Sequence, residues 1–582
     1  MTRRIRWMSS LILFLGLSGV VLGLMPPLAS WPVALPITIL HVLLAVVLGV
    51  LAGSLLFPHM RKNGRWQAGG RSGWGSLVFL SLVVISGSSL LIQGQRGRLP
   101  ILHTIAGLGF LAIVFSHGGF KHLRRRFRSS LRLVLTSGFV VLAAGLMLSA
   151  RPTHSTVSPE VKEFPPASMR ILGELPPFDE ELMGASRCSD CHAQIVAEWK
   201  QSMHAVADTE LLYARVVGEF RKDYGFEASN WCAGCHSPLR LGRGELNEKV
   251  ALVAQPNVDC IVCHSIRKAQ EPIGNNRYDL AFTIPSRYGL AKAGRLSDKL
   301  LLLQPAVHRS MWNGSFMRSA EFCGVCHRQT LPDSLSDGHG GLVIQDTYQE
   351  WAKSRYNTAD QATRRTCQDC HMPVASGLAA DLGNQRPSHL FLGGSMDIAR
   401  ILGAHTAYAE SKRFLEKAAT IAVTYSGGER GSLGLSVKVT NSGAGHNLPT
   451  GVTDLRDLWL EVSVTNEANE VVYESGKLDA GGFLDPLAVR FGMILGDGKG
   501  AAMHFHHITR AREILSDTSI AAGETREVHY VVPGASAKRL KAEVRLLYRA
   551  VPQAFINHYM TPDLRTEVVV MATASATVEL TP

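Results

Sequence analysis

Two absences organise this 582-residue sequence. Residues 1–150 contain fifteen Lys and Arg residues and no Asp or Glu, whereas the remainder carries 45 Lys and Arg against 48 Asp and Glu. The net charge of +12 therefore belongs to the first quarter of the chain, which argues against a nucleic-acid-binding surface on the rest. The second absence is cysteine outside one short motif: all ten cysteines fall into five pairs of identical spacing, and none follows residue 370.

Each cysteine pair encloses two residues and is followed at once by a histidine. The motifs are Cys188, Cys191 and His192; Cys232, Cys235 and His236; Cys260, Cys263 and His264; Cys323, Cys326 and His327; and Cys367, Cys370 and His371. Zinc sites have no reason to place His directly after the second Cys, a redox-active dithiol needs only one pair, and disulfide scaffolds vary their spacing. C-x-x-C-H is the attachment signature of c-type haem, in which the adjacent imidazole binds the iron. The sequence therefore predicts five covalently bound haems c.

Five apolar stretches in the acid-free segment are long enough to span a bilayer. They run roughly over 8–25, 36–57, 75–93, 100–117 and 131–149. Lys and Arg gather at the N-terminus and in alternate loops, so the positive-inside rule predicts a cytoplasmic N-terminus and places everything after residue 150 on the other side, where c haems are attached. We therefore predict a lipid-embedded domain in the bacterial inner membrane, with the rest of the chain in the periplasm. The first 30 residues also resemble a cleavable signal peptide, but we favour a retained helix.

Histidines stand at both ends of the second and fourth apolar stretches. His41 and His59 are 18 residues apart, and His103 and His117 are 14 apart. In a helix these spacings return close to the same face, with separations of about 27 and 21 Å. This arrangement suits one or two haems b, each held between the two helices by paired imidazoles, because ionisable residues in such stretches are usually functional. The alternative is that these histidines sit at the level of the lipid headgroups.

Histidines outside the motifs decide how the c haems are completed. A haem with two axial ligands usually only carries electrons, whereas one with an open sixth position can bind a substrate. The candidate distal ligands are His204, His389, His405 and His446. His204 ends the stretch EWKQSMH, and the partial echo EWAKSRY has Tyr356 in its place. His389 and His446 occupy loops with Gly or Pro that can cover a haem face, and His405 begins a predicted helix; an exposed side chain is the alternative for each.

The remaining chain divides by composition and periodicity. Residues 151–186 hold six prolines and predict a semi-rigid spacer, 187–395 form the predicted pentahaem domain of short helices and loops, and 396–418 predict a helical connector. From 419 to 582 the hydrophobic period becomes two, as in DLWLEVSVTN and TREVHYVVP. About seven such segments predict an all-β, sandwich-like domain. The predicted fold is thus multidomain: a transmembrane helical bundle over 1–150, the haem domain and a β domain.

Several stretches carry a resemblance to a known family. They are CSDCHAQIVAEWKQSMHA, EFCGVCHRQT, TYQEWAKSRYNTADQATRRTCQDCHMP and SHLFLGG. They resemble multihaem c-type cytochromes related to the tetrahaem cytochrome c of nitrifying bacteria. Within that group the chain is similar to inner-membrane, quinol-linked multihaem cytochromes of metal-reducing bacteria, and its first segment resembles membrane cytochrome b subunits of respiratory oxidoreductases. The resemblance implies that His204 is a haem ligand, but a shared fold does not specify a reaction.

These features predict a membrane-anchored cytochrome that takes electrons from the quinol pool, through haem b where it is bound, and passes them along five c haems to a periplasmic cytochrome or other redox partner. One alternative is a reductase or oxidoreductase of a small nitrogen or sulfur compound at a c haem with an open position. The C-x-x-C-K motif that some multihaem nitrite reductases use is absent. Another alternative is an anchored electron carrier with an inert membrane segment. The sequence predicts no catalytic side chain.

Overall fold

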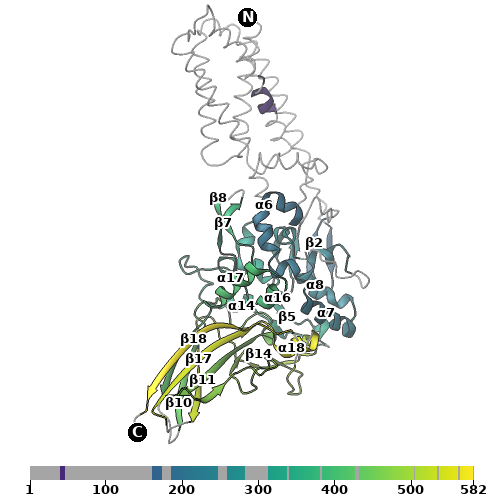
Figure 1. Cartoon of the computed structure of the whole chain (residues 1–582). Helices are drawn as coiled ribbons and strands as arrows, with labels where there is room; N and C mark the ends of the chain where they lie inside the picture. Colours follow the sequence, from purple (N-terminus) through teal and green to yellow (C-terminus); the bar gives the residue numbers. More distant parts are fainter. Residues whose placement is uncertain are drawn as a thin grey trace, which may run out of the picture. The chain divides into compact units, whose positions relative to one another are not determined.

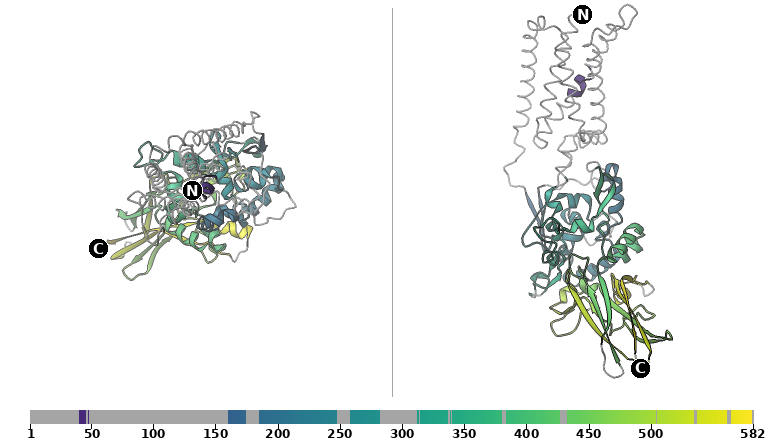
Figure 2. Two further views of the ribbon diagram at one scale, coloured as in Figure 1. Left: turned by 90° about the horizontal axis from the view of Figure 1, so that it is seen from above. Right: turned by 90° about the vertical axis from the view of Figure 1, so that its left-hand side faces the viewer.

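The structure is a computed structural model. It describes residues 40–45, 47, 160–173, 185–246, 258–281, 312, 314–336, 338, 340–379, 383–426, 432–503, 505–533, 537–560 and 564–580. The chain divides into two compact units, one of residues 1–158 with 283–313 and the other of 159–282 with 314–582. Nearly all described residues belong to the second unit, which is drawn as coloured ribbon in Figures 1 and 2.

The prediction of an N-terminal transmembrane bundle is wrong by this structure. Across the described ranges, no helix has the length and apolar character needed to cross a bilayer. His41 lies in a short helical stretch, 40–45, while His59, His103 and His117 lie outside the described residues. The inner-membrane location was inferred from that bundle and is corrected with it. The two predictions rested on the apolar runs before residue 150 and on the distribution of Lys and Arg around them.

The haem-binding region consists of short helices joined by loops. Its helices are α6 (Ala185–Trp199), η2 (Met203–Val206), α7 (Leu211–Tyr224), η3 (Glu227–Ser229), α8 (Asn230–His236), α9 (Pro238–Gly242), α10 (Cys260–Ser265), η6 (Ser315–Arg318), α13 (Ala320–Gly324), η7 (Asp333–Leu335), α14 (Thr347–Ala352) and α15 (Cys367–His371). Each C-x-x-C-H motif begins within one of these helices, and residues three apart on a helix share a face. The two thiols of a motif therefore point to the same side.

Helix caps fix where two of the motif helices start. The Asp259 side chain accepts the backbone N–H of Cys260 at the start of α10. Thr366 and Asp369 form a capping box at the start of α15. Because capping satisfies N–H groups that the helix leaves unpaired, the residue before each of these motifs determines that the helix begins at the first cysteine.

Part of the predicted spacer belongs to the haem-binding region. The strands β1 (Val161–Phe164) and β2 (Ala167–Leu172) join β4 (Tyr278–Leu280) and β3 (Ile266–Ala269) in one sheet, in the order β1-β2-β4-β3. Alternate residues of β2 are buried, among them Met169 and Ile171. The prolines predict a spacer, but Pro165 and Pro166 form the turn between these two strands.

Smaller elements complete this region. Two small ribbons are formed by β5 (Gln329–Thr330) paired with β6 (Val343–Gln345), and by β7 (Val374–Ala379) paired with β8 (Gly383–Pro387). The predicted helical connector is present as α16 (Met396–Ile401) and α17 (His405–Leu415). Gly403 separates them with a φ of 72°, a left-handed conformation that favours glycine.

The C-terminal region is rich in strands, as its period-two segments predict. One sheet has the order β16 (Thr525–Pro533), β10 (Ser432–Thr440), β9 (Thr420–Ser426), and the other has β12 (Val471–Ser475), β11 (Asp457–Asn466), β17 (Arg539–Arg549), β18 (Val569–Glu579), with β13 (Arg490–Phe491) beside β11. The ribbon β14 (Met493–Gly496)–β15 (Glu513–Asp517), η8 (Thr453–Leu455), η9 (Ile508–Arg510) and helix α18 (Gln553–Tyr559) complete it. The segments DLWLEVSVTN and TREVHYVVP coincide with β11 and β16 residue for residue.

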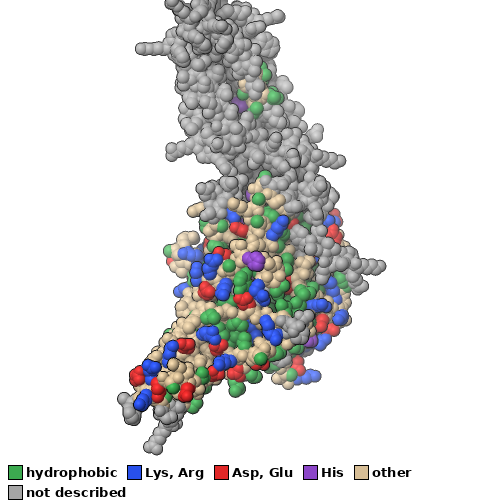
Figure 3. All heavy atoms as spheres, viewed as in Figure 1, with side chains coloured by type: hydrophobic (Ala, Val, Ile, Leu, Met, Phe, Trp, Pro, Cys, Tyr) green, Lys and Arg blue, Asp and Glu red, His purple; other side chains and the backbone are tan. Residues whose placement is uncertain are grey.

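One continuous core fills this β-rich region. Leu435, Val437 and Val439 of β10 and Leu460 and Val462 of β11 are among its fully buried members. The long strands β10, β11, β17 and β18 lie together in Figure 1. On the face drawn in Figure 3, Lys and Arg side chains are mixed with Asp and Glu, in keeping with the near balance of charge after residue 150.

Candidate multihaem centre

Three of the four predicted distal histidines lie among the motif histidines. Burial, together with the smaller effect of nearby His327, lowers the pKa of His204 to about 3. Burial also lowers the pKa of His389 to about 4, with His264 contributing, and that of His446 to about 4. These imidazoles are therefore neutral at pH 7, which is the form that binds a metal.

His327 occupies an interior surface. Burial in the protein lowers its pKa to about 4, yet its side chain is exposed in the structure. A ring that is surrounded by protein and still accessible faces an internal space rather than bulk solvent. A cofactor-binding wall has this combination.

Several imidazoles are oriented through Nδ1. The bonds run from His236 Nδ1 to Ala207 O at 2.7 Å, His371 to Leu392 O at 2.5 Å, His389 to Pro387 O at 3.1 Å and His446 to Asn447 O at 2.9 Å. A carbonyl only accepts, so the ring must donate from Nδ1, which leaves the Nε2 lone pair for a metal. These side chains are thus prepared in the tautomer that a haem ligand requires.

Two pairs of imidazoles face each other at one characteristic spacing. The ring centroids of His204 and His327 are 6.2 Å apart, and those of His371 and His446 are 6.1 Å apart. Two imidazoles bound to opposite sides of one metal at about 2 Å have centroids about 6 Å apart. The spacing of each pair therefore fits an iron between the two rings.

Cysteines of different motifs lie side by side. A hydrogen bond with Cys188, together with burial, raises the pKa of Cys260. A hydrogen bond with Cys235 does the same for Cys326, and one with Cys367 for Cys323. None of the ten cysteines is disulfide-bonded. The first motif thus neighbours the third, the second neighbours the fourth, and the fourth neighbours the fifth.

A glycine inside the second motif permits close packing. A Cβ at Gly234, in the second motif, would lie 2.6 Å from the side chain of Asn276. That side chain donates to the carbonyl of Trp231 at 3.1 Å and accepts from the backbone N–H of Met169 at 3.3 Å. Gly234 therefore lets Asn276 join the second motif to strand β2.

Two further side chains support His236 and were not found from the sequence. The ring of Tyr213 stacks on that of His236, with centroids 4.1 Å apart and planes 11° apart. Asp208 follows the carbonyl that accepts His236 Nδ1–H and pairs with buried Arg240 at 3.0 Å. No motif marks either residue; an Asp and a Tyr at loop and helix positions are common, and only the fold brings them to the imidazole.

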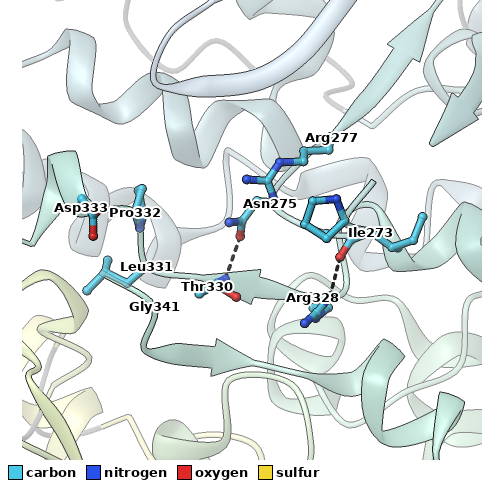
Figure 4. A pocket seen from close by; sticks show the side chains of 11 residues that line it. Ile273, Asn275, Arg277, Arg328, Thr330, Leu331, Pro332, Asp333 and Gly341 are labelled. Carbon is cyan, nitrogen blue, oxygen red and sulfur yellow. Dashed lines mark hydrogen bonds between the residues drawn. The ribbon is translucent and has the colours of Figure 1, made fainter. Parts of the chain in front are cut away.

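A pocket of about 420 Å³ adjoins the fourth motif (Figure 4). It is lined by Pro272, Ile273, Gly274, Asn275, Arg277, Arg328, Thr330, Leu331, Pro332, Asp333 and Gly341. Asn275 Oδ1 accepts the N–H of Thr330 at 2.7 Å, and Arg328 Nη1 donates to the carbonyl of Ile273 at 3.0 Å. Arg328 directly follows His327, so these bonds fix the segment that carries the ligand.

His405 is the predicted distal ligand that the structure leaves outside this cluster. It is exposed and begins α17. The sequence suggested His405 because a helix start can point a side chain at a haem. In the structure its ring is exposed instead. The membrane candidates His59, His103 and His117 lie outside the described residues.

The chain is similar to known proteins over parts of its length. Residues 187–265 match the family model described as cytochrome c554 and c-prime. A probable nitrite reductase-hydroxylamine oxidoreductase fusion protein of Kuenenia stuttgartiensis is 23% identical over 265 residues, which are 39% of this chain and 29% of that protein. The chain thus spans under a third of that relative's length.

One solved structure is also similar. The penta-heme cytochrome c552 from Thermochromatium tepidum has a TM-score of 0.47 and 21% identity, over 68% of this chain and 99% of that one. Five C-x-x-C-H motifs, the oriented imidazoles and the family match at residues 187–265 together support a multihaem c-type cytochrome of the cytochrome c554 kind.

Proposed function

We propose that this chain transfers electrons along five covalently bound haems c. The observation that carries the proposal is the pair of imidazole spacings, 6.2 Å for His204 and His327 and 6.1 Å for His371 and His446. Two imidazoles on one iron leave it no open position, which suits electron transfer more than substrate binding. His389, beside His264, is the proposed distal ligand of the third motif.

The residues of the chain would hold the haems and keep their ligands in place. The cysteine pairs would hold the porphyrins, and the adjacency of the motifs would keep neighbouring attachment points close enough for rapid transfer. Buried, neutral imidazoles oriented by backbone carbonyls keep their Nε2 atoms in place. Haem c, when bound, accepts and releases one electron at its iron.

The electron donor and acceptor remain proposals. The quinol pool is the proposed donor and a redox protein the proposed acceptor. Mixing the purified protein with a soluble quinol analogue, and recording the reduced haem bands, tests the first. Reduction at a rate unrelated to quinol concentration would remove quinol from the proposal without affecting the haem assignment.

The main test is spectroscopic. A pyridine haemochrome assay on the full chain is expected to give about five haems c, one for each motif. Electron paramagnetic resonance of the oxidised protein is expected to show low-spin signals, and His446→Ala should convert one of them to high spin. A protein whose low-spin fraction does not respond to His446→Ala would contradict the axial pair.

A second candidate is oxidoreduction of a small nitrogen compound. It is favoured by the similarity to the probable nitrite reductase-hydroxylamine oxidoreductase fusion protein. It requires one haem with an open position. Addition of nitrite or hydroxylamine should then shift a high-spin signal; an unchanged spectrum would count against this candidate.

A further inference from the structure

The two Glu-Trp dipeptides that echo each other in the sequence occupy equivalent places in the structure. Glu198 and Trp199 end α6, and Glu350 and Trp351 lie in α14. In both copies the Ser three residues after the Trp donates its backbone N–H to the Trp carbonyl, at 2.8 and 2.9 Å. Both Trp side chains are buried. The short sequence echo is therefore a repeat of backbone and packing.

Each Trp indole holds the segment that leads into a C-x-x-C-H motif. Trp199 Nε1 donates to the carbonyl of Val258 at 3.0 Å, and Trp351 Nε1 donates to the carbonyl of Arg365 at 2.8 Å. Val258 and Arg365 both stand two residues before the first cysteine, in the third and the fifth motif respectively. The two indoles thus make the same contact at the same place in the motif.

The backbone N–H groups of the same two residues, Val258 and Arg365, also make equivalent hydrogen bonds in the two copies. The N–H of Val258 donates to the carbonyl of His204 at 3.3 Å, and the N–H of Arg365 donates to the carbonyl of Tyr356 at 3.2 Å. His204 and Tyr356 occupy the same position after their dipeptides. The two copies therefore share the backbone contact although 53 residues separate its partners in one copy and only eight in the other.

Each Glu carboxylate holds a loop that carries a histidine outside the motifs. Glu198 Oε2 accepts the backbone N–H of His389 at 2.9 Å. Glu350 Oε2 accepts the backbone N–H of Asn447, the residue after His446, at 3.1 Å. Each Glu therefore tethers its loop through a side-chain oxygen.

The two arms of each dipeptide meet at one proposed haem site. In the first copy the Trp holds the third motif, whose His264 lies near the tethered His389. In the second copy the Trp holds the fifth motif, whose His371 faces the tethered loop's His446. One dipeptide therefore sets both the attachment segment and the opposite imidazole.

We propose that the two Glu-Trp dipeptides are copies of one bracket, in which the Trp positions a C-x-x-C-H motif and the Glu positions the distal histidine of the same haem. The inference rests on the proposed function in taking His389 and His446 as axial ligands. Glu198 and Glu350 are positioning residues: they touch the loop backbone, and the imidazole beside that contact keeps its place because the loop does.

The copies differ in what else the carboxylate binds. Glu198 also accepts two hydrogen bonds of 2.7 Å from buried Arg386. Glu350 instead accepts the hydroxyl of Thr450 at 2.5 Å. Removing Glu198 leaves a buried guanidinium without its carboxylate, whereas removing Glu350 leaves only neutral donors. Glu350 is therefore the cleaner position for a test.

The test uses the full chain with its haems attached and measures carbon monoxide binding to the reduced protein. An iron that keeps two imidazoles binds the gas poorly, and one that loses its distal imidazole binds it. Glu350→Ala is expected to add about one carbon monoxide per chain and to raise the high-spin fraction by about one haem in five. Glu350→Gln keeps an acceptor oxygen for both donors and is expected to restore most of the original spectrum.

Asp360 supplies a matched control in the same loop region. Its carboxylate accepts the backbone N–H of Ala362 at 3.1 Å and the hydroxyl of Thr363 at 2.6 Å, the same two donor types that Glu350 binds. Asp360→Ala should leave carbon monoxide binding unchanged. If Glu350→Ala does not accumulate with five haems, Glu350→Asp withdraws the carboxylate by one methylene and is expected to act in the same direction.

A double-mutant comparison separates this inference from the proposed function. Once His446→Ala has removed the ligand, Glu350→Ala should add nothing further, whereas it should add its full effect to His389→Ala. If His446→Ala itself leaves carbon monoxide binding unchanged, the axial pair of the proposed function fails. If His446→Ala opens a site and Glu350→Ala, folded and with five haems, does not, the bracket is overturned.

Discussion

The haem-binding region and the β-rich region have interiors of different kinds. In the β-rich region a single core joins both sheets through residues such as Val437, Leu460 and Val544. The described part of the haem-binding region has several small clusters instead, for example one around Met169 and Ile171 and another around Phe220. A chain segment that buries little apolar surface of its own needs another source of stability. Porphyrin, when bound, would supply this surface.

The polar interior differs in the same way. The haem-binding region buries imidazoles whose pKa values burial lowers, such as those of His204 and His446. In the β-rich region a buried carboxylate, Asp457, is paired with Arg549 at 2.6 Å. Imidazoles with Nε2 left for a metal are stable as a set only when the metal is bound. One region is therefore completed by its cofactors and the other by its own side chains.

The largest expected effect comes from withholding the cofactors. The full chain produced without haem attachment should lose cooperative structure in the haem-binding region and keep the β-rich region folded. Limited proteolysis is expected to leave a resistant fragment that begins near residue 419, while the haem-loaded protein is cut far more slowly before that point. Equal resistance of both regions in the haem-free protein would remove the distinction.

Buried ion pairs offer a matched comparison between the regions. Arg240→Met removes the guanidinium paired with buried Asp208 and leaves the Ser237 hydroxyl as a neutral donor to it, and the expected loss is about 3–5 kcal/mol in the unfolding of the haem-binding region. Arg549→Met should cost less in the β-rich region, because Asp457 keeps its second partner, Arg490. Denaturant unfolding followed by Soret absorbance and by tryptophan fluorescence measures both. A larger effect from Arg549→Met would reverse this ranking.

The sequence predicted best the features that local chemistry determines. Five motifs predict the haem attachment residues, and the period of two predicted the strands β11 and β16 at their observed bounds. The spacer prediction failed for residues 161–172, because the strands there are defined by pairing with β4, more than 100 residues away. Proline content alone does not report such long-range pairing.

The candidate site shows the same limit. His204 was singled out by its echo with Tyr356, and His446 by its loop, but their partners His327 and His371 follow only from the fold. Tyr213 had no signal at all, since stacking on an imidazole needs no special spacing. The predicted membrane bundle is not matched by an apolar helix of membrane-spanning length in the described residues.

Truncating a core side chain in the β-rich region tests whether the two regions are stabilised independently. Leu460→Ala removes a fully buried side chain from the middle of β11, and the expected loss is about 2–5 kcal/mol in the unfolding of the β-rich region. The haem spectrum should not change, since this residue belongs to the continuous core of the two sheets. A shift in the Soret band of the folded variant would mean that the two regions do not unfold separately.

The smallest expected effect concerns a group that links the regions. Glu350 of α14 binds Asn447 and Thr450, and burial raises its pKa from 4.5 to about 7. Between pH 4.5 and 7 the folded chain keeps a proton that the unfolded chain has lost, so stability falls as the pH rises through this window, by on the order of 1–3 kcal/mol. Glu350→Gln cannot titrate and should flatten this part of the profile. Unfolding of both proteins in denaturant at several pH values measures the difference, and parallel profiles would mean that Glu350 is already ionised at pH 5, so that the contact between the regions is more open to water than its burial indicates.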